Sequence, residues 1–170
     1  PVPGPLKSAL FTTGAETTEN AVKIARAATG RTGIIAFTGG FHGRTALASA
    51  LTGKVAPYKK DFGPPLPNVW HAPFPTPQGG VDAAEALKHL DFIFKADCAP
   101  SSIAAIIIEP VQGEGGFHQA PADLMRGLRR ICDAHGIVLI ADEVQTGFGR
   151  TGKMFAMEHY DVAPDIVCVA

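Results

Sequence analysis

The chain has 170 residues, of which 46% are hydrophobic and 18% are charged, and its formal net charge is -1. The chain has fifteen Lys and Arg residues and sixteen Asp and Glu residues, so it has no excess of positive charge with which to bind the phosphate backbone of a nucleic acid. This argues against nucleic-acid binding. The longest apolar runs are far shorter than the ~20 residues of a membrane helix, and three scattered cysteines suggest neither a disulfide framework nor a Cys-based zinc site.

The first helix is expected from about Ala15 to Thr29, after a proline-rich start in residues 1–10 that should be extended. Thr13 and Glu16 have the spacing of a capping box, and Gly30 is placed to end the helix. The i, i+3, i+4, i+7 pattern predicts a buried face made of Ala21, Ile24, Ala25 and Ala28.

Helical patterns and uninterrupted apolar runs then alternate along the chain. Strands that are apolar along their whole length are typical of parallel sheets covered on both faces. The sequence therefore predicts an α/β fold with a mostly parallel sheet sandwiched by helices, and the proline-rich stretch 57–77 is expected to cross the surface. The predicted strands are Ile34–Thr38, about Val69–Ala72, Ile103–Ile108, Ile137–Ala141 and Ile166–Ala170, and the predicted helices are Asp82–Lys95 and Ala122–His135.

Polar groups gather at the predicted carboxyl ends of three strands. In open parallel sheets, ligands bind outside these ends. The residues there are Thr38–Gly40, Glu109 and Asp142–Gln145, so we look for a site among them.

Gly147, Gly149 and Gly152 form a GxGxxG pattern that we do not interpret as a dinucleotide site. In such a site the first glycine directly follows a strand and a helix begins after the last glycine. The sequence predicts neither condition here. The chain also lacks a Walker A sequence, a GxSxG nucleophile motif and any metal-ligand spacing among its His, Cys, Asp and Glu residues.

Two other places have both a functional and an ordinary interpretation. Thr12–Glu16 is either an anion site at a helix start or a simple helix cap, and Gly14 would permit close backbone approach. Asp142 is either the partner of a protonated heterocyclic nitrogen or a strand-end carboxylate satisfied by loop amides.

The segments Phe41–Arg44 and Glu109–Gly116 are also open to two interpretations. Phe41 could stack on a flat ring and Arg44 could bind a carboxylate, or they could be a core residue and a solvated one beside a capping His42. Glu109 and Glu114 could pair with a cation or be ordinary loop acids.

Taken together, five segments resemble the class III aminotransferases of the fold-type I group that uses pyridoxal 5'-phosphate (PLP). The resemblance runs from about Leu10 to Ala170 and implies an aspartate-aminotransferase-like fold. The five segments are TGAETTENAVK (13–23), FHGRT (41–45), ALTGK (50–54), IEPVQGEGG (108–116) and ADEVQTGFGRTG (141–152).

The resemblance implies which residues bind the cofactor. Gly14 and Ala15 would hold the PLP phosphate through their backbone amides, although many relatives have Ser or Thr at position 15. Phe41 would stack on the pyridine ring and Val144 would pack against its opposite face. Asp142 would keep the ring nitrogen protonated and would be the catalytic residue of this segment.

The same resemblance implies one more cofactor contact, from Gln145, and the substrate contacts. Gln145 would lie near the ring hydroxyl, and Arg44 would bind the substrate carboxylate. Glu114 would pair with a mobile arginine elsewhere in the protein, and Glu109 would line the same pocket.

The resemblance further implies that residues 1–170 are part of a large PLP-binding domain. The lysine that bonds to the cofactor would follow the strand at 166–170, so that this lysine, an N-terminal segment and a C-terminal small domain fall outside the sequence. We expect the sequence to be a segment of a longer protein, because it stops within a predicted core strand. The parent would be a cytoplasmic homodimer or dimer of dimers, with neither nucleic-acid nor membrane partners.

The implied reaction is transfer of the amino group of an ω-amino acid to a 2-oxo acid. Residues 50–54 favour 4-aminobutyrate and 2-oxoglutarate as the substrates, giving succinate semialdehyde and glutamate. An ornithine, acetylornithine or other ω-amino acid aminotransferase is the alternative within the class. A non-catalytic remnant that keeps the fold as a binding module is the alternative outside it.

Overall fold

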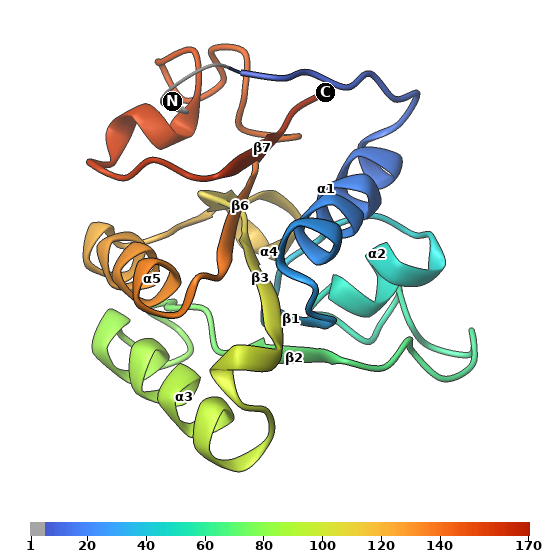
Figure 1. Cartoon of the computed structure of the whole chain (residues 1–170). Coiled ribbons are helices and arrows are strands. Elements are labelled where there is room, and N and C mark those ends of the chain that lie inside the picture. The colour runs from blue at the N-terminus through green and yellow to red at the C-terminus, as the bar shows by residue number, and fades with distance from the viewer. Residues whose placement is uncertain (1–5) are drawn as a thin grey trace.

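Five parallel strands form the central sheet of the computed structural model, which describes residues 6–170 (Figure 1). Their order across the sheet is β2-β1-β3-β6-β7, and every neighbouring pair is parallel. The predicted α/β class with a mostly parallel sheet is confirmed. The strands are β1 (Gly33–Phe37), β2 (Val69–Ala72), β3 (Ile103–Ile108), β6 (Val138–Asp142) and β7 (Ile166–Cys168).

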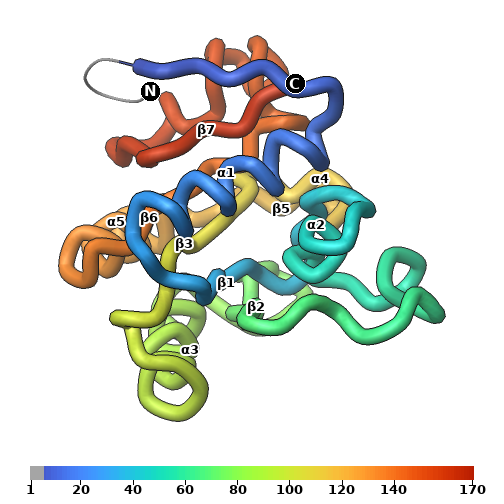
Figure 2. Tube along the Cα trace, turned by 45° about the vertical axis from the view of Figure 1, so that its right-hand side comes forward, coloured from blue at the N-terminus to red at the C-terminus, as the bar shows by residue number. Residues whose placement is uncertain are grey.

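Helices cover both faces of this sheet, as Figures 1 and 2 show from two directions. Helices α1 (Gly14–Thr29) and α2 (Ala46–Leu51) lie on one face, and α3 (Ala83–Ala96) and α5 (Ala122–His135) lie on the other. Each face has its own apolar core, and the central strand β3 contributes to both. This double burial explains why β3 is apolar at every position.

Capping residues fix the ends of the long helices, and at α1 they are Thr13 and Gly30, as the sequence predicted. Thr13 caps α1 by accepting a hydrogen bond from the amide of Glu16, and Asp82 caps α3 in the same way. Gly30 and Gly136 end α1 and α5 in the left-handed conformation, with φ of 69° and 62°.

The predicted buried face of α1 is partly wrong. Ala21 and Ala25 are buried, but Ile24 is 51% exposed and Ala28 is also exposed. The helix is rich in small residues, so its apolar pattern fits more than one face, and contact with β3, β6 and β7 selects the neighbouring row. That row consists of Thr18, Ala21, Val22 and Ala25.

Several short elements were not predicted. They are α2, the one-turn helix α4 (Gly113–Gly116), the antiparallel pair β4 (Val111–Gln112) and β5 (His118–Gln119), and 3-10 turns at Pro100–Ser102 and Ala156–His159. The last strand is also shorter than expected and ends at Cys168. Residues 6–11 form neither helix nor strand, and residues 1–5 of the predicted extended start lie outside the described part of the chain.

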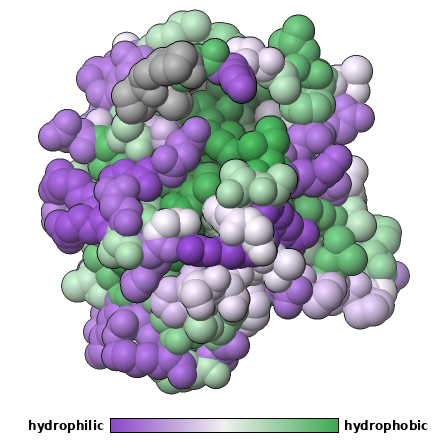
Figure 3. Space-filling model, viewed as in Figure 1, coloured by the Kyte–Doolittle hydropathy of each residue, from purple (hydrophilic) through white to green (hydrophobic). Residues whose placement is uncertain are grey.

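The surface facing the viewer in Figure 3 is mixed, with polar side chains gathered on the left, over α5 and α3. Apolar side chains are exposed elsewhere, among them Leu10, Phe62 and Phe117. Within residues 6–170, no helix is long and apolar enough to cross a membrane.

Candidate functional site

The register of the sheet brings the two predicted strand-end carboxylates together. Strands β3 and β6 are parallel, and Ile108 lies opposite Ala141. Glu109 follows directly after β3 and Asp142 is the last residue of β6, so both occupy the same edge. This is the carboxyl edge, where a ligand site is expected in a parallel sheet.

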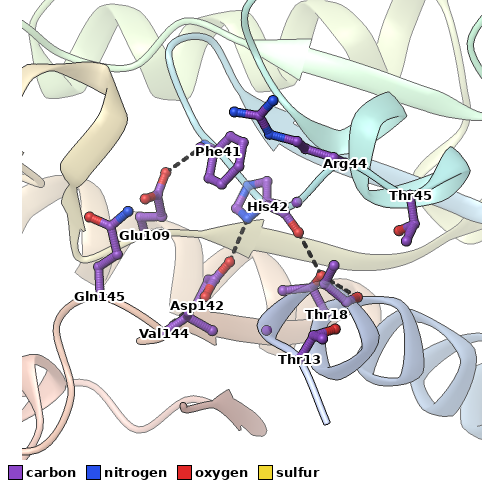
Figure 4. A pocket seen from close by; sticks show the side chains of 13 residues that line it. Thr13, Thr18, Phe41, His42, Arg44, Thr45, Glu109, Asp142, Val144 and Gln145 are labelled. Carbon is purple, nitrogen blue, oxygen red and sulfur yellow. Dashed lines mark hydrogen bonds and ion pairs between the residues drawn. The ribbon is translucent and has the colours of Figure 1, made fainter. Parts of the chain in front are cut away.

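A cavity of about 550 Å³ opens at this edge (Figure 4). Its walls come from the start of α1, the turn after β1, the residue after β3 and the end of β6 with the turn that follows. All predicted site residues except Glu114 line it. These residues are Gly14, Ala15, Phe41, Arg44, Glu109, Asp142, Val144 and Gln145.

The start of α1 forms one end of the cavity. As the first residues of the helix, Gly14 and Ala15 have amides without an i−4 helical acceptor, which makes this end a favourable place for an anion. A Cβ at position 14 would lie 2.9 Å from Val144 Cγ1, so glycine is needed for this close approach. The side chain of Val144 thereby packs directly beside the start of α1.

The turn after β1 is fitted closely to the same helix start. Gly43 has a φ of 123°, and a Cβ there would lie 2.6 Å from the Cβ of Ala15. The hydroxyl of Thr18 donates to the carbonyl of His42, at 2.8 Å, which ties the turn to α1. These contacts fix the position of the neighbouring Phe41 relative to Gly14 and Ala15.

A buried pair between His42 and Asp142 forms the floor of the cavity (Figure 4). His42 Nδ1 lies 2.7 Å from Asp142 Oδ2, and the two residues are only 3% and 5% exposed. Burial lowers the pKa of His42, but the hydrogen bond and the charge of Asp142 outweigh it and raise the pKa overall. Asp142 Oδ1 also accepts a hydrogen bond from the Val144 amide, at 3.2 Å.

His42 is the main site residue that the sequence did not reveal. It is neither a helix cap nor a surface residue, so the capping interpretation is wrong. Its partner lies 100 positions away in the chain, and only the fold brings the two together. The available signal was its place between Phe41 and Gly43 in a turn at the carboxyl edge.

Glu109 is buried beside this pair and accepts a hydrogen bond from the Phe41 amide, at 2.8 Å. Burial raises the pKa of Glu109 to about 7; the charge of His42 opposes this rise and that of Asp142 adds to it. Glu109 therefore changes its charge near neutral pH, and it also fixes the backbone of Phe41.

Arg44 and Glu114 lie at the outer side of the site, and both are exposed. Arg44 Cζ lies 5.4 Å from the ring centroid of Tyr58, whose hydroxyl donates to Glu114 Oε2 at 2.8 Å. Glu114 is not part of the cavity wall. Tyr58 belongs to the proline-rich stretch, and no sequence pattern marked it as part of the site.

Glu143, beside Asp142, is another residue that the sequence did not single out. It is fully buried, and its carboxylate accepts hydrogen bonds from the amides of Ala156 and Met157 and from the hydroxyl of Thr146. These bonds anchor the long turn after β6 and with it the end of the strand that carries Asp142.

The arrangement suits a flat heterocycle with an anionic arm. The helix start can bind the anion, Phe41 and Val144 are available for the faces of a ring, and Asp142 can pair with a protonated ring nitrogen. Arg44 offers a guanidinium for a carboxylate at the cavity mouth. Among residues 6–170, no group of three or more His, Cys, Asp and Glu side chains is arranged to hold a metal ion.

Comparison with known proteins identifies relatives along nearly the whole chain. Residues 2–170 match the profile of the family described as Aminotransferase class-III. The chain is 57% identical to a 5-aminovalerate aminotransferase of Pseudomonas putida and 55% identical to a 4-aminobutyrate aminotransferase of Escherichia coli. Each alignment covers 99% of this chain and 40% of the relative, so the chain spans about two-fifths of the length of these relatives.

Solved structures of transaminases share the fold. An amine transaminase from an uncultivated Pseudomonas species, in its PLP-bound form, aligns with a TM-score of 0.86 and 36% identity over 94% of this chain and 39% of its own. A taurine:2-oxoglutarate aminotransferase from Bifidobacterium kashiwanohense, in complex with PLP and glutamate, aligns with a TM-score of 0.82 and 39% identity, over 91% of this chain and 36% of its own.

Proposed function

The chain belongs to the class III aminotransferase family, and from this premise we propose that the whole protein transfers the amino group of an ω-amino acid to a 2-oxo acid with PLP as cofactor. The observation that carries the proposal is the cavity at the carboxyl edge of the sheet. This cavity is lined by the start of α1, which can bind an anion, by the buried acid Asp142, which can pair with a ring nitrogen, and by the guanidinium of Arg44.

The residues that would hold the cofactor fit its three chemical parts. The amides of Gly14 and Ala15 would bind the phosphate, and Phe41 and Val144 would enclose the ring. Asp142 would accept a hydrogen bond from the protonated ring nitrogen. When bound, PLP supplies an electron sink that stabilises negative charge on the substrate carbon.

Neighbouring groups would prepare Asp142 for this role. His42 holds one carboxylate oxygen at 2.7 Å, so the carboxylate has a fixed orientation inside the cavity. Gln145 would lie beside the ring hydroxyl, and Glu109 would line the substrate end of the pocket. Arg44 would bind the substrate carboxylate and orient the amino group toward the cofactor.

We also propose that residues 1–170 are part of a large PLP-binding domain. The residues that line the cavity include no lysine, so the lysine that bonds to the cofactor would come from outside this sequence. A covalent lysine is needed to hold the cofactor and to move a proton between substrate and cofactor carbons. An N-terminal segment and a C-terminal small domain would complete the protein.

The proposed donor is 4-aminobutyrate, and the proposed acceptor is 2-oxoglutarate. 5-Aminovalerate is the second candidate donor, because the relative with 57% identity is named for it and the one with 55% identity for 4-aminobutyrate. The two donors differ by one methylene group, which a pocket distinguishes only weakly. A cytoplasmic homodimer or dimer of dimers is the proposed assembly. Exposed apolar residues such as Leu10, Phe62 and Phe117 support contact with a second copy or with the rest of the protein.

The absorption spectrum of the whole protein with PLP tests the proposal. We expect a yellow band that 4-aminobutyrate bleaches and 2-oxoglutarate restores. A band that responds to 5-aminovalerate or ornithine but not to 4-aminobutyrate would keep the reaction class and change the donor. The absence of any band from the folded whole protein would contradict the proposal and favour a non-catalytic binding module.

Replacing Arg44 tests the carboxylate site separately. Because Arg44 is exposed at the cavity mouth, Arg44→Ala should leave PLP affinity nearly unchanged while the KM for carboxylate substrates rises roughly tenfold or more. Arg44→Lys, which keeps the charge without the fork of donors, should have an intermediate effect. Equal losses of PLP and substrate affinity would contradict the assignment.

A further inference from the structure

Tyr58 contacts three residues that have roles in the proposed site. Its hydroxyl donates to Glu114 Oε2 at 2.8 Å. The centroid of its ring lies 4.8 Å from the centroid of the Phe41 ring and 5.4 Å from Arg44 Cζ. Tyr58 thus contacts an exposed acid through its hydroxyl and an exposed base through its ring.

The segment that carries Tyr58 is held in place at several points. The hydroxyl of Ser49 donates to the Tyr58 carbonyl, and the ammonium group of Lys59 donates to the carbonyl of Ala50 in α2. Lys54 donates to the main-chain carbonyl of Glu114, at 2.6 Å. The backbones on both sides of the Tyr58–Glu114 bond are therefore anchored, and the Glu114 carboxylate accepts a hydrogen bond from the Tyr58 hydroxyl.

The charges of Arg44 and Glu114 both act on the hydroxyl of Tyr58. The hydrogen bond to Glu114 is the main cause that raises the pKa of Tyr58, and the charge of Arg44 opposes it. The hydroxyl thus remains a donor at neutral pH. Within residues 6–170, Arg44 has no carboxylate partner, and the only hydrogen bond of the Glu114 carboxylate is the one from Tyr58.

We propose that Tyr58 is a positioning residue that keeps Arg44 available for the substrate carboxylate. The hydroxyl holds Glu114 at one end of the ring while the ring face holds Arg44, so the two opposite charges stay apart. Without the hydroxyl, no group within residues 6–170 holds the Glu114 carboxylate, which can then turn toward Arg44 and compete with the substrate carboxylate. The inference rests on the proposed role of Arg44 in substrate binding.

The expected effect of this competition is modest and specific. An exposed ion pair contributes up to about 1 kcal/mol, which corresponds to about a fivefold change in an equilibrium constant. Tyr58→Phe, which keeps the ring and removes the hydroxyl, should therefore weaken carboxylate binding about three- to fivefold. The kcat at saturating substrate should change less than the KM.

The test measures the Kd of sodium butanoate, a carboxylate without an amino group, for the PLP-loaded whole protein by calorimetry. The variants are Tyr58→Phe, Glu114→Gln and the double variant. In the Glu114→Gln background the acid that the Tyr58 hydroxyl holds is absent, so we expect Tyr58→Phe to have no further effect on the Kd. Tyr160→Phe is the matched control, since it removes a buried tyrosine hydroxyl bonded to the carbonyls of Pro110 and Ala120.

A Tyr58→Phe effect of the same size in both backgrounds would overturn the inference, because the hydroxyl would then act independently of Glu114. An unchanged Kd in the single variant would overturn it as well, and so would a wild-type protein that does not bind butanoate. These outcomes differ from a failure of the proposed function, in which butanoate binds but no amino transfer occurs.

Discussion

Glu109 is a carboxyl group whose chemistry is set by burial at the edge of the sheet. The charges of His42 and Asp142 act on it in opposite directions, and within residues 6–170 its direct donors are backbone amides such as that of Phe41. These amides do not offset the loss of water around the ionised carboxylate, so the pKa rises from 4.5 to about 7. The local sequence around Glu109 contains no sign of this shift.

This shift predicts a pH dependence of stability. The folded protein holds the Glu109 proton up to about pH 7 and the unfolded chain loses it near pH 4.5, so stability from this group falls as pH rises between these values. The loss approaches about 3 kcal/mol, at 1.36 kcal/mol per unit of pKa. Glu109→Gln should remove it, as measured by urea unfolding of the cofactor-free whole protein between pH 4.5 and 7.5.

The control for this experiment is Glu85→Gln, which removes an exposed carboxylate in the first turn of α3. Its stability profile should follow that of the wild type. If Glu109→Gln also follows the wild-type profile, Glu109 ionises normally and its burial does not control its charge.

At the scale of elements, the turn after β6 is held by a buried acid and not by regular structure. Glu143 bonds to Thr146 within the turn and to the amides that begin the 3-10 helix Ala156–His159. The turn contains the GxGxxG pattern of residues 147–152, which follows four further turn residues after the strand and does not lead into an α-helix. The glycines of this pattern therefore belong to a loop and not to the start of an α-helix.

Glu143→Gln should loosen this turn. The variant places an NH2 group where an oxygen now faces backbone donors, and a buried unsatisfied donor costs about 1–3 kcal/mol. We expect a loss of about 2 kcal/mol in urea unfolding, together with weaker PLP binding because Asp142 is adjacent.

Glu158→Gln is the matched control for this variant. Its exposed side chain accepts a hydrogen bond from the Phe155 amide at the start of the same 3-10 helix, and the amide oxygen of Gln preserves that bond. The control should cost less than about 0.5 kcal/mol, as is usual for surface substitutions. Equal losses in the two variants would contradict the special role of Glu143.

At the scale of the whole molecule, a side chain far from the site ties together the amino edge of the sheet. The site lies at the carboxyl edge, whereas Arg31, just before β1, lies at the amino edge. Its guanidinium Nη1 donates to the carbonyls of Ile103, His135 and Gly136, at 3.1, 2.8 and 3.1 Å. One side chain thus joins the starts of β1 and β3 to the end of α5.

Arg31→Ala should therefore destabilise the protein without affecting the site. Loss of charge-assisted bonds to three carbonyls predicts a decrease of about 2 kcal/mol in the free energy of unfolding. The Kd for PLP should stay within twofold of the wild type. Arg130→Ala, at an exposed arginine of α5, should leave both quantities unchanged, and a large rise in the PLP Kd of Arg31→Ala would contradict this separation.

The long elements could be predicted because their signals are local. Strand β3 and helix α5 have the predicted bounds, since six consecutive apolar residues and a 3.6-residue pattern ending at Gly136 each depend only on nearby residues. The short elements α2, α4 and the β4–β5 pair could not be predicted. Each is too short to show a periodic apolar pattern, and its conformation depends on contacts with other parts of the fold.

The sequence by itself determined the α/β class, the family resemblance and the edge of the sheet at which the site lies. The position of polar residues after apolar strands is sufficient for this, because parallel strands place their carboxyl ends together. Only the tertiary structure decided which side chains meet there. His42 with Asp142 and Tyr58 with Glu114 are pairs separated by 100 and 56 positions, and no local pattern encodes contacts at such separations.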